Sequence, residues 1–544
     1  MKKIYLSAAL LACTLMNAQA PFWTATSYKG AFPVTDNTPA TNWTSGWSNF
    51  DPENTVYGAA TQTVSADITA NTTWSGIVCL QNKVYVKNNA VLTIQPGTII
   101  RGDKATQGSL IITRGAQINA AGTMASPIVF TSNESVGNRA EGDWGGLVVL
   151  GNAINNQPGG VANIEGITPT LDTEFGGTND NDNSGVLKYI RIEFAGIALQ
   201  PNKEINGLTL GSVGSATQMD HIQVSFSGDD SFEWFGGTVD AKWLIAYRGL
   251  DDDFDCDFGF RGRIQFGLII RDKDLSDAIG DSNAWECDND GTGSSATPFT
   301  RPVFSNITVV GPKGNGTIGL PVGEKFEKSF RLRRNSAVSV FNSLSTGWEK
   351  GLSIEAANTE AQYTSGNAYF SNNILTNYAT ATKVVTAANS FYATFFGANG
   401  NDTTTTIAQI NWVNIFTALG TTPDPRLNTG SSAATGAAFT NTVFGSSFTG
   451  IKNSANFSDK FVSVYPNPAA DVATLVIDAV NASSLNVNIY DINGKLVSTP
   501  VINQNLVSGE NTFTLNTSNL NNGVYFVTLN STNGKETVKL VVSK

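Results

Sequence analysis

Histidine and cysteine are nearly absent from this chain of 544 residues. It has one histidine, His221, and four cysteines. A single histidine leaves one candidate base for any Ser-His-Asp or Cys-His device, and His221 stands in a strand-like run where a structural role is the expected one. With no histidine cluster and no cysteine pair at ligand spacing, the composition also argues against a zinc site.

Long apolar runs are missing too. No stretch reaches the roughly 18 apolar residues of a membrane-spanning helix, so we expect no transmembrane segment. Lys2 and Lys3 precede a short apolar run that ends before Ala18-Gln19-Ala20, the pattern of a cleaved signal peptide over residues 1–20. The alternative for this segment is a lipoprotein with Cys13 as the lipidated residue.

Basic residues are scarce relative to acidic ones. Without Lys2 and Lys3 the chain has 32 basic and 45 acidic residues, a formal balance of −13. Because nucleic-acid binders rely on cationic contacts with phosphate, this balance excludes that class of protein. The imbalance is concentrated in residues 220–290, which contain 17 acidic and 6 basic side chains.

What the sequence has in quantity is short runs of β-branched and apolar residues, most of them followed by Gly or Asn. Strands this short cannot bury an apolar face singly and must stack on neighbours, as in solenoid proteins. The runs are Val84–Val86, Val91–Ile94, Thr98–Ile100, Leu110–Ile112, Ile128–Phe130 and Leu147–Leu150.

An internal repeat sets the period of the stack. Asp229–Gly237 aligns with Asp251–Gly259 at an offset of 22 residues. This spacing is typical of one coil of a right-handed parallel β-helix, whereas a propeller of four-stranded blades repeats at about 40 residues. We therefore predict an all-β fold, with a right-handed parallel β-helix over residues 75–450 in which Phe232 stacks on Phe254.

The same alignment stacks acidic side chains. Residues one coil apart lie about 4.8 Å from each other, and like charges held that close need a cation or a proton. In an exported protein the available hard cation is Ca²⁺, which takes oxygen ligands, and Asp288-Asn289-Asp290-Gly291 adds a loop of similar character. The predicted ligands of a structural Ca²⁺ are Asp229, Asp230, Glu233, Asp251, Asp252 and Asp255.

The next step of the alignment brings two cysteines into register. Glu286-Cys287-Asp288 aligns with Asp255-Cys256-Asp257 once nine extra residues are looped out. Cysteines on adjacent coils have a Cα separation within disulfide range, and the expected compartment is oxidising. We predict a Cys256–Cys287 disulfide, which leaves Cys79 as the odd cysteine.

Several of these runs resemble the right-handed β-helix of surface proteins with a pectin-lyase-like fold. The matching residues are Val84-Tyr85-Val86, Leu92–Ile100, Gly115–Ile118, Ser126–Thr131, Gly142–Leu147, Arg333–Ser336 and Phe341–Ser343. The resemblance implies the fold. It also raises the alternative of a calcium-dependent polysaccharide lyase, for which Lys242, Arg248, Arg261 and Arg263 are the candidate bases.

Two aromatic segments are related to each other. Tyr28–Phe32 followed by Asn42-Trp43 is similar to Phe395–Ala398 followed by Asn411-Trp412. A solenoid needs its ends covered, so we predict that both segments cap the stack, with residues 21–74 as the N-terminal cap. Trp43 is a candidate sugar-binding platform, and packing is the alternative role.

The last residues form a separate module. Short alternating strands with Asn-Gly turns predict a small β-sandwich over 462–544, after a linker over 451–461. The module resembles the type A C-terminal sorting domain of the type IX secretion system, on Tyr465-Pro466-Asn467-Pro468, Ile489-Tyr490-Asp491, Asn493-Gly494-Lys495, Gly523-Val524-Tyr525-Phe526 and Lys539-Leu540-Val541-Val542. The resemblance implies export by that machinery through the periplasm and the outer membrane.

Together these features predict an exported protein, secreted or held at the cell surface, with a rigid β-helix body. Adhesion or glycan binding with structural calcium is the expected function, and the polysaccharide lyase is the alternative. The expected partners are the type IX secretion machinery and an extracellular glycan.

Overall fold

The computed structural model describes residues 22–36, 38, 41–200, 203–277, 282–314, 323, 325–376, 384–385, 399–418, 420–444, 461–465, 469–479, 483–491, 495–507, 509–531 and 534–544. The chain divides into two compact units, residues 1–439 and 440–544, and each is described by itself. The predicted signal peptide and nearly all of the predicted linker lie outside the described residues, so both stay predictions.

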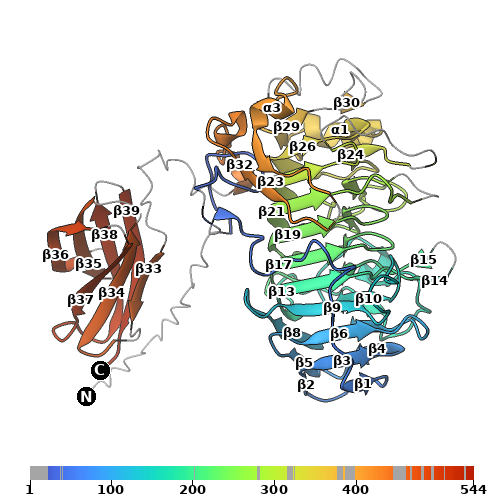
Figure 1. The fold of residues 1–544 in the computed structure, drawn as a ribbon, viewed down its shortest axis with the longest axis horizontal. Coiled ribbons are helices and arrows are strands. Elements are labelled where there is room, and N and C mark those ends of the chain that lie inside the picture. The colour runs from blue at the N-terminus through green and yellow to red at the C-terminus, as the bar shows by residue number, and fades with distance from the viewer. Residues whose placement is uncertain are drawn as a thin grey trace, which may run out of the picture. The chain divides into compact units, whose positions relative to one another are not determined.

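The first unit is a stack of parallel strands, coloured from blue through green to yellow in Figure 1. Over the described residues its larger sheet has sixteen strands. They are β1 (Gln62–Val64), β2 (Thr72–Trp74), β3 (Ile77–Leu80), β5 (Val91–Ile94), β6 (Ile99–Gly102), β8 (Gln117–Ala121), β9 (Ile128–Ser132), β13 (Gly185–Glu193), β17 (Gln218–Ser225), β19 (Ala241–Tyr247), β21 (Arg263–Ile270), β23 (Val303–Val310), β25 (Ser339–Phe341), β26 (Leu344–Thr346), β28 (Phe370–Ser371) and β29 (Ile374–Thr376).

The second sheet has ten strands over the same part of the chain. They are β4 (Lys83–Val86), β7 (Ser109–Ile112), β10 (Gly146–Leu150), β16 (Leu208–Gly211), β18 (Phe232–Phe235), β20 (Phe254–Asp257), β22 (Trp285–Cys287), β24 (Lys328–Leu332), β27 (Lys350–Ile354) and β30 (Val384–Val385). The other strands and α-helices among the described residues of this unit are β11 (Ala162–Asn163), β12 (Glu174–Phe175), β14 (Ala198–Gln200), β15 (Lys203–Glu204), β31 (Trp412–Asn414), β32 (Asp424–Leu427), α1 (Ala357–Thr364) and α3 (Ile407–Ile410).

The chain alternates between the two sheets, and each circuit adds one strand to the ten-stranded sheet and either one long strand or two short ones to the larger sheet. Alternate side chains point inward, and those of successive coils stack in columns. Phe232 pairs in register with Phe254, and their ring centroids lie 5.6 Å apart. Both side chains are fully buried, and Trp285 continues the column in the next coil. The parallel β-helix and the repeat that predicted it are confirmed.

The larger sheet bends at one residue of each coil. Tyr189, His221, Trp243 and Phe266 have φ between 48° and 63°, a left-handed conformation that turns a strand through a corner. Their rings stack from coil to coil, with His221 4.3 Å from Tyr189 and 4.6 Å from Trp243. The Nδ1 of His221 contacts Asp220 Oδ1 at 2.7 Å, so this histidine is part of the packing, as its strand-like position predicts.

Of the predicted N-terminal cap, residues 22–50 lie along the side of the stack and do not cover an end, whereas β1 and β2 are the first strands of the larger sheet. Residues 22–50, here named the N-terminal strap, run beside the larger sheet (Figure 1). The outer face of that sheet carries Phe226, Tyr247 and Leu268, which Phe32, Trp47 and Phe50 of the strap cover. Apolar side chains on the outer face of a sheet are more stable when they are shielded from water, which explains why the aromatic residues of the strap lie against this face.

Late residues join the strap on the same face. Trp412 packs in the same apolar cluster, and Val34 forms a parallel bridge with Leu427. Phe395–Ala398 lies outside the described residues, so of the later aromatic segment only Asn411-Trp412 can be compared with the strap. Trp43 stacks on Phe32 with ring centroids 5.0 Å apart and donates its Nε1 hydrogen to Ala31 O, so its role is packing.

Buried amide side chains hold the strap. Gln265 accepts a hydrogen bond from Thr24 N and donates one to Thr24 O, and Gln223 does the same with Asn49. Each glutamine imitates the main-chain pairing of a neighbouring strand.

We predict that Gln265→Leu lowers the free energy of unfolding by about 1–3 kcal/mol, because the two hydrogen bonds between its side chain and the main chain of Thr24 are lost. Urea denaturation of the full-length mature protein measures this, and limited proteolysis should release the strap earlier. Gln62→Leu, on the exposed strand β1, is the control. Equal midpoints for the two variants would contradict the assignment.

The second unit is an antiparallel sandwich, as predicted. One sheet contains β33 (Phe461–Tyr465), β34 (Val472–Ala479) and β37 (Gly509–Asn516). The other contains β36 (Leu496–Leu506), β35 (Ser483–Asp491), β38 (Gly523–Ser531) and β39 (Gly534–Val542). Leu475, Val487 and Val527 are among the fully buried residues between them. In neither unit do the described residues include a helix long and apolar enough to cross a membrane.

Candidate functional site

Acidic side chains form a row on the outer face of the ten-stranded sheet. Glu233 of β18 pairs in register with Asp255 of β20, and Asp255 pairs with Glu286 of β22. Their inward neighbours in these strands are the stacked Phe232, Phe254 and Trp285. The alternation of the strands therefore turns all three carboxylates outward, one above another.

A second set of carboxylates precedes these strands. Asp230 Oδ1 accepts a hydrogen bond of 2.9 Å from Asp252 N, one coil further on. Asp252 Oδ1 in turn accepts from Asn283 N and Nδ2. The turns before the strands thus stack in the same way as the strands.

The two sets form one continuous ladder. Its ligand atoms lie within 4.8 Å of one another in three overlapping groups. The groups are Asp229 with Asp230 and Asp251, Asp230 with Glu233 and Asp255, and Asp252 with Asp255 and Glu286. All six residues predicted from the sequence belong to this carboxylate ladder, and Glu286 extends it.

The environment of the ladder favours protonated or cation-bound carboxylates. Burial, and then the charge of Asp229, raises the pKa of Asp251 to about 8. Burial, and then the charge of Asp251, raises the pKa of Asp252 to about 8. The pKa values of Asp230 and Asp255 rise well above the ordinary value for the same reasons, and every charged group that dominates their shifts is acidic.

Arginines close one end of the ladder. Arg331, in register with Glu286, donates to it at 2.8 Å. Arg333 pairs with both Glu286 and Asp288, and Arg334 contacts Asp288 at 2.7 Å. The sequence does not predict these partners, because 40 residues separate β22 from β24 and hide the register.

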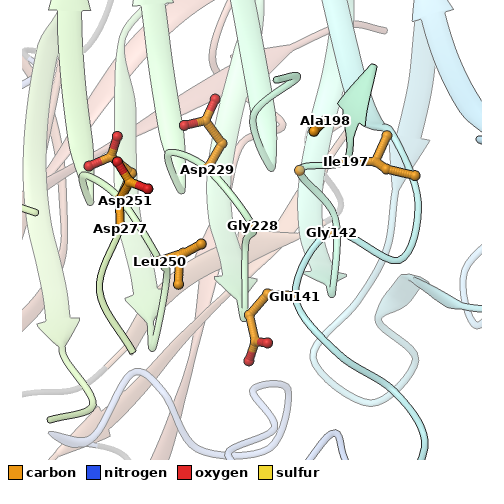
Figure 2. Close-up of a pocket in the computed structure, with 10 residues that line it drawn as sticks. Glu141, Gly142, Ile197, Ala198, Gly228, Asp229, Leu250, Asp251 and Asp277 are labelled. Carbon is orange, nitrogen blue, oxygen red and sulfur yellow. The ribbon is translucent and has the colours of Figure 1, made fainter. Parts of the chain in front are cut away.

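A hollow opens at the other end of the ladder. It has a volume of about 460 Å³, and Figure 2 shows Asp229, Asp251 and Asp277 around it, with Glu141 on the opposite wall. Gly142, Gly196 and Gly228 lie on its floor, and a Cβ on Gly196 would lie 2.6 Å from Gly228 N. Glycine is therefore needed here for the coils to approach each other.

The predicted oxygen-rich loop after β22 is not part of the ladder. Although burial raises the pKa of Asp290, hydrogen bonds from Ser294 and Thr292 lower it to about 2. Both Asp290 carboxylate oxygens are thus used within their own loop. Asp288 is held by arginines, as described above.

The four candidate lyase bases lie away from the ladder. Arg248, Arg261 and Arg263 form ion pairs with Asp272, Asp180 and Asp240, respectively. Lys242 donates to the Thr24 hydroxyl at 2.9 Å and lies over the Phe22 ring. All four contact residues outside the carboxylate ladder.

Comparison with known families identifies the larger unit. Residues 62–417, about two thirds of the chain, match the model of a pectate-lyase-like β-helix domain. The chain belongs to the pectate-lyase-like β-helix family. Residues 463–543 match a secretion system C-terminal sorting domain, as their motifs predict. No curated protein matches the chain significantly.

The two matches establish where this β-helix protein works. A type IX sorting tail marks it for export, so it is secreted or displayed at the cell surface. The secretion machinery handles the chain through this tail. A family match does not fix activity, which depends on the residues of the site.

The ladder predicts an unusual dependence of stability on pH. In the folded state burial raises the pKa of Asp251 and of Asp252 to about 8, whereas unfolded carboxyl groups have a pKa near 4. The folded protein therefore binds more protons between these values, and the free energy of unfolding should fall as pH rises through this window.

Calorimetry in EDTA at pH 5 and pH 8 measures this. We expect a melting temperature several degrees lower at pH 8, and a smaller difference for Asp252→Asn. Asp274→Asn, an exposed carboxyl next to Lys273, is the control. A melting temperature that rises between pH 5 and pH 8 would show that the ladder is ionised in the folded state.

Cys256 and Cys287 are register neighbours with fully buried side chains. Both thiols are free in the structure, and the two side chains are hydrogen-bonded to each other, so the disulfide stays a prediction. The placement of the pair on adjacent coils is as the alignment predicts.

Non-reducing peptide mapping of the exported protein tests the crosslink. We expect one peptide pair joining Cys256 to Cys287, with Cys79 recovered as a free thiol. Closing a loop of this length would stabilise the fold by about 3–4 kcal/mol. Recovery of all three cysteines alkylated without reduction would rule the disulfide out.

Proposed function

We propose that this exported protein binds an extracellular glycan on the outer face of its ten-stranded sheet, with Ca²⁺ held by the carboxylate ladder. The observation that carries the proposal is the ladder itself. Its six predicted members come from two successive coils that place like charges at register positions.

Calcium fits the chemistry of the ladder. Ca²⁺ takes six to eight oxygen ligands in flexible geometry, and carboxylates are its usual ligands. Burial of several adjacent acids is costly unless a cation or protons neutralise them. At neutral pH outside the cell, a bound cation would replace the protons that otherwise neutralise Asp251 and Asp252.

A glycan fits the surface around the ion. Carboxylates accept hydrogen bonds from hydroxyl groups, and the glycine floor beside Asp229 and Asp251 leaves room for a flat, polar ligand. A rigid β-helix on the cell surface can present such a face without rearranging, and adhesion to a glycan-coated surface follows from it.

Binding is favoured over lyase chemistry because the arginines that touch the ladder are paired, whereas Lys242, whose pKa burial lowers to about 8, contacts Thr24 away from the ladder. A lyase needs a Lys or Arg that can accept a proton. Although burial lowers the pKa of Arg333, the charges of Glu286 and Asp288 hold it above its ordinary value. Arg331 is likewise paired with Glu286.

Calcium should raise the melting temperature of the mature protein at pH 8, and EDTA should reverse the change, because a ligand that binds only the folded state stabilises it. Asp255 belongs to two of the three overlapping groups. We expect Asp255→Asn to reduce the shift and to weaken Ca²⁺ binding at least about tenfold in titration calorimetry. Asp274→Asn should behave as the wild type.

A melting temperature that ignores both Ca²⁺ and EDTA would remove the ion from the proposal. Incubation with polyuronates then checks the enzyme alternative. Absorbance from a new unsaturated product, abolished by EDTA, would replace binding with lyase activity.

A further inference from the structure

A second hollow lies beyond the carboxylate ladder, where β18 and β20 end. It has a volume of about 440 Å³ and is named here the aromatic hollow. Phe235 and Phe258 form its apolar side, and the connection between β11 and β12 forms the other. The residues that line it are Asn163, Ile164, Glu165, Gly166, Ile167, Thr168, Pro169, Phe235 and Phe258.

Phe258 occupies a backbone position that favours glycine. Its φ is 52°, and the corresponding residue of the preceding coil is Gly236, with φ 73°. A bulky side chain in this conformation is unfavourable, and such positions cluster at binding sites. Aromatic residues also take this conformation at the corners of the larger sheet, and Phe258 packs against the apolar cluster that contains Phe175 and Phe235, so what bears on a ligand is the part of its ring that this packing leaves accessible.

The ring of Phe258 is the accessible end of an aromatic row. Its centroid lies 5.1 Å from that of Phe235, which stacks on Phe175 at 6.0 Å. Phe235 and Phe175 are buried, whereas Phe258 is half-buried and lines the hollow. Part of an aromatic ring is thus left to a ligand.

One carboxylate lines the hollow, and a second lies in register beside Phe235. Glu165 is exposed on the opposite wall and lies close enough to Glu233 to raise its pKa, after burial and Asp229. Asp257 pairs in register with Phe235. A sugar ring has an apolar face of C–H groups and a rim of hydroxyl donors, which matches an aromatic side with acceptors around it.

We propose that the aromatic hollow binds one uncharged sugar ring of the glycan, stacked on Phe258. The inference rests on the proposed function and adds the class of sugar. The lining residues include an acidic side chain and no basic one, so a ring with its own carboxylate would be repelled. The glycan would then have an uncharged sugar ring next to the sugar residues that lie over the carboxylate ladder.

Titration of the full-length mature protein in Ca²⁺ tests this, with cellohexaose, xylohexaose and a galacturonate hexamer as probes. We expect the wild type to bind a neutral hexamer. Phe258→Gly restores the residue type of the preceding coil and relieves the positive φ, but it loses the ring contact with Phe235, so its melting temperature is measured first to show that it folds. We expect it to bind that hexamer roughly tenfold more weakly. Leu171→Ala, exposed between β11 and β12 but outside the hollow, should bind as the wild type.

The outcomes separate the two proposals. Binding of a neutral hexamer that Phe258→Gly weakens and Leu171→Ala does not supports the hollow. Calcium-dependent binding that is equal in the wild type and Phe258→Gly overturns the hollow and leaves the proposed function standing. A wild type that binds only the galacturonate hexamer overturns the neutral ring, and one that binds no probe overturns both proposals.

Discussion

The register between parallel coils is the constraint on which the rest of this structure depends. Main-chain hydrogen bonds between successive strands fix each residue beside its counterpart one coil away, about 4.8 Å distant. A side chain therefore always has a copy of the same structural position above and below it. Apolar residues gain from this arrangement, as the column of Phe232, Phe254 and Trp285 does through its ring contacts. Acidic residues in register repel one another, and their repulsion is relieved by a bound cation or by protonation.

The outer faces of the two sheets meet this constraint differently. The larger sheet carries apolar residues outside as well as inside, and the N-terminal strap covers them. On the ten-stranded sheet, Ile111 and Val148 of the early coils lie under the β11–β12 connection, in one cluster with Phe235. The acids begin where that cover ends. The aromatic hollow and the carboxylate ladder are thus neighbours at a boundary between covered and open sheet.

The sequence predicts those residues of the site that lie in the two repeated coils. An offset of 22 residues was enough to bring Glu233 to Asp255 and Phe232 to Phe254, because the intervening turns have equal length in these coils. The sequence does not predict Arg331, because the long connection before β24 interrupts the repeat. In the structure Arg331 nevertheless pairs in register with Glu286, in the same column. The strap was misplaced for a different reason. The aromatic residues of the strap predict that it is buried. They pack on outward-facing side chains of the larger sheet, and the alternation of inward and outward residues along a strand would by itself predict that these side chains face solvent.

The distribution of charge along the carboxylate ladder indicates that these acids are kept for a reason other than stability. Arg331 and Arg333 neutralise Glu286 at one end, which shows that the fold can supply a basic side chain to this column. Around Asp230 and Asp255 the dominant charges are acidic. Replacing buried ionic groups by apolar residues is often neutral or stabilising, so a fold selected for stability alone would not keep them. Arg271, which pairs with the buried Asp253, offsets part of the charge of Asp251 and Asp252, and the Ca²⁺ of the proposed function would offset the rest.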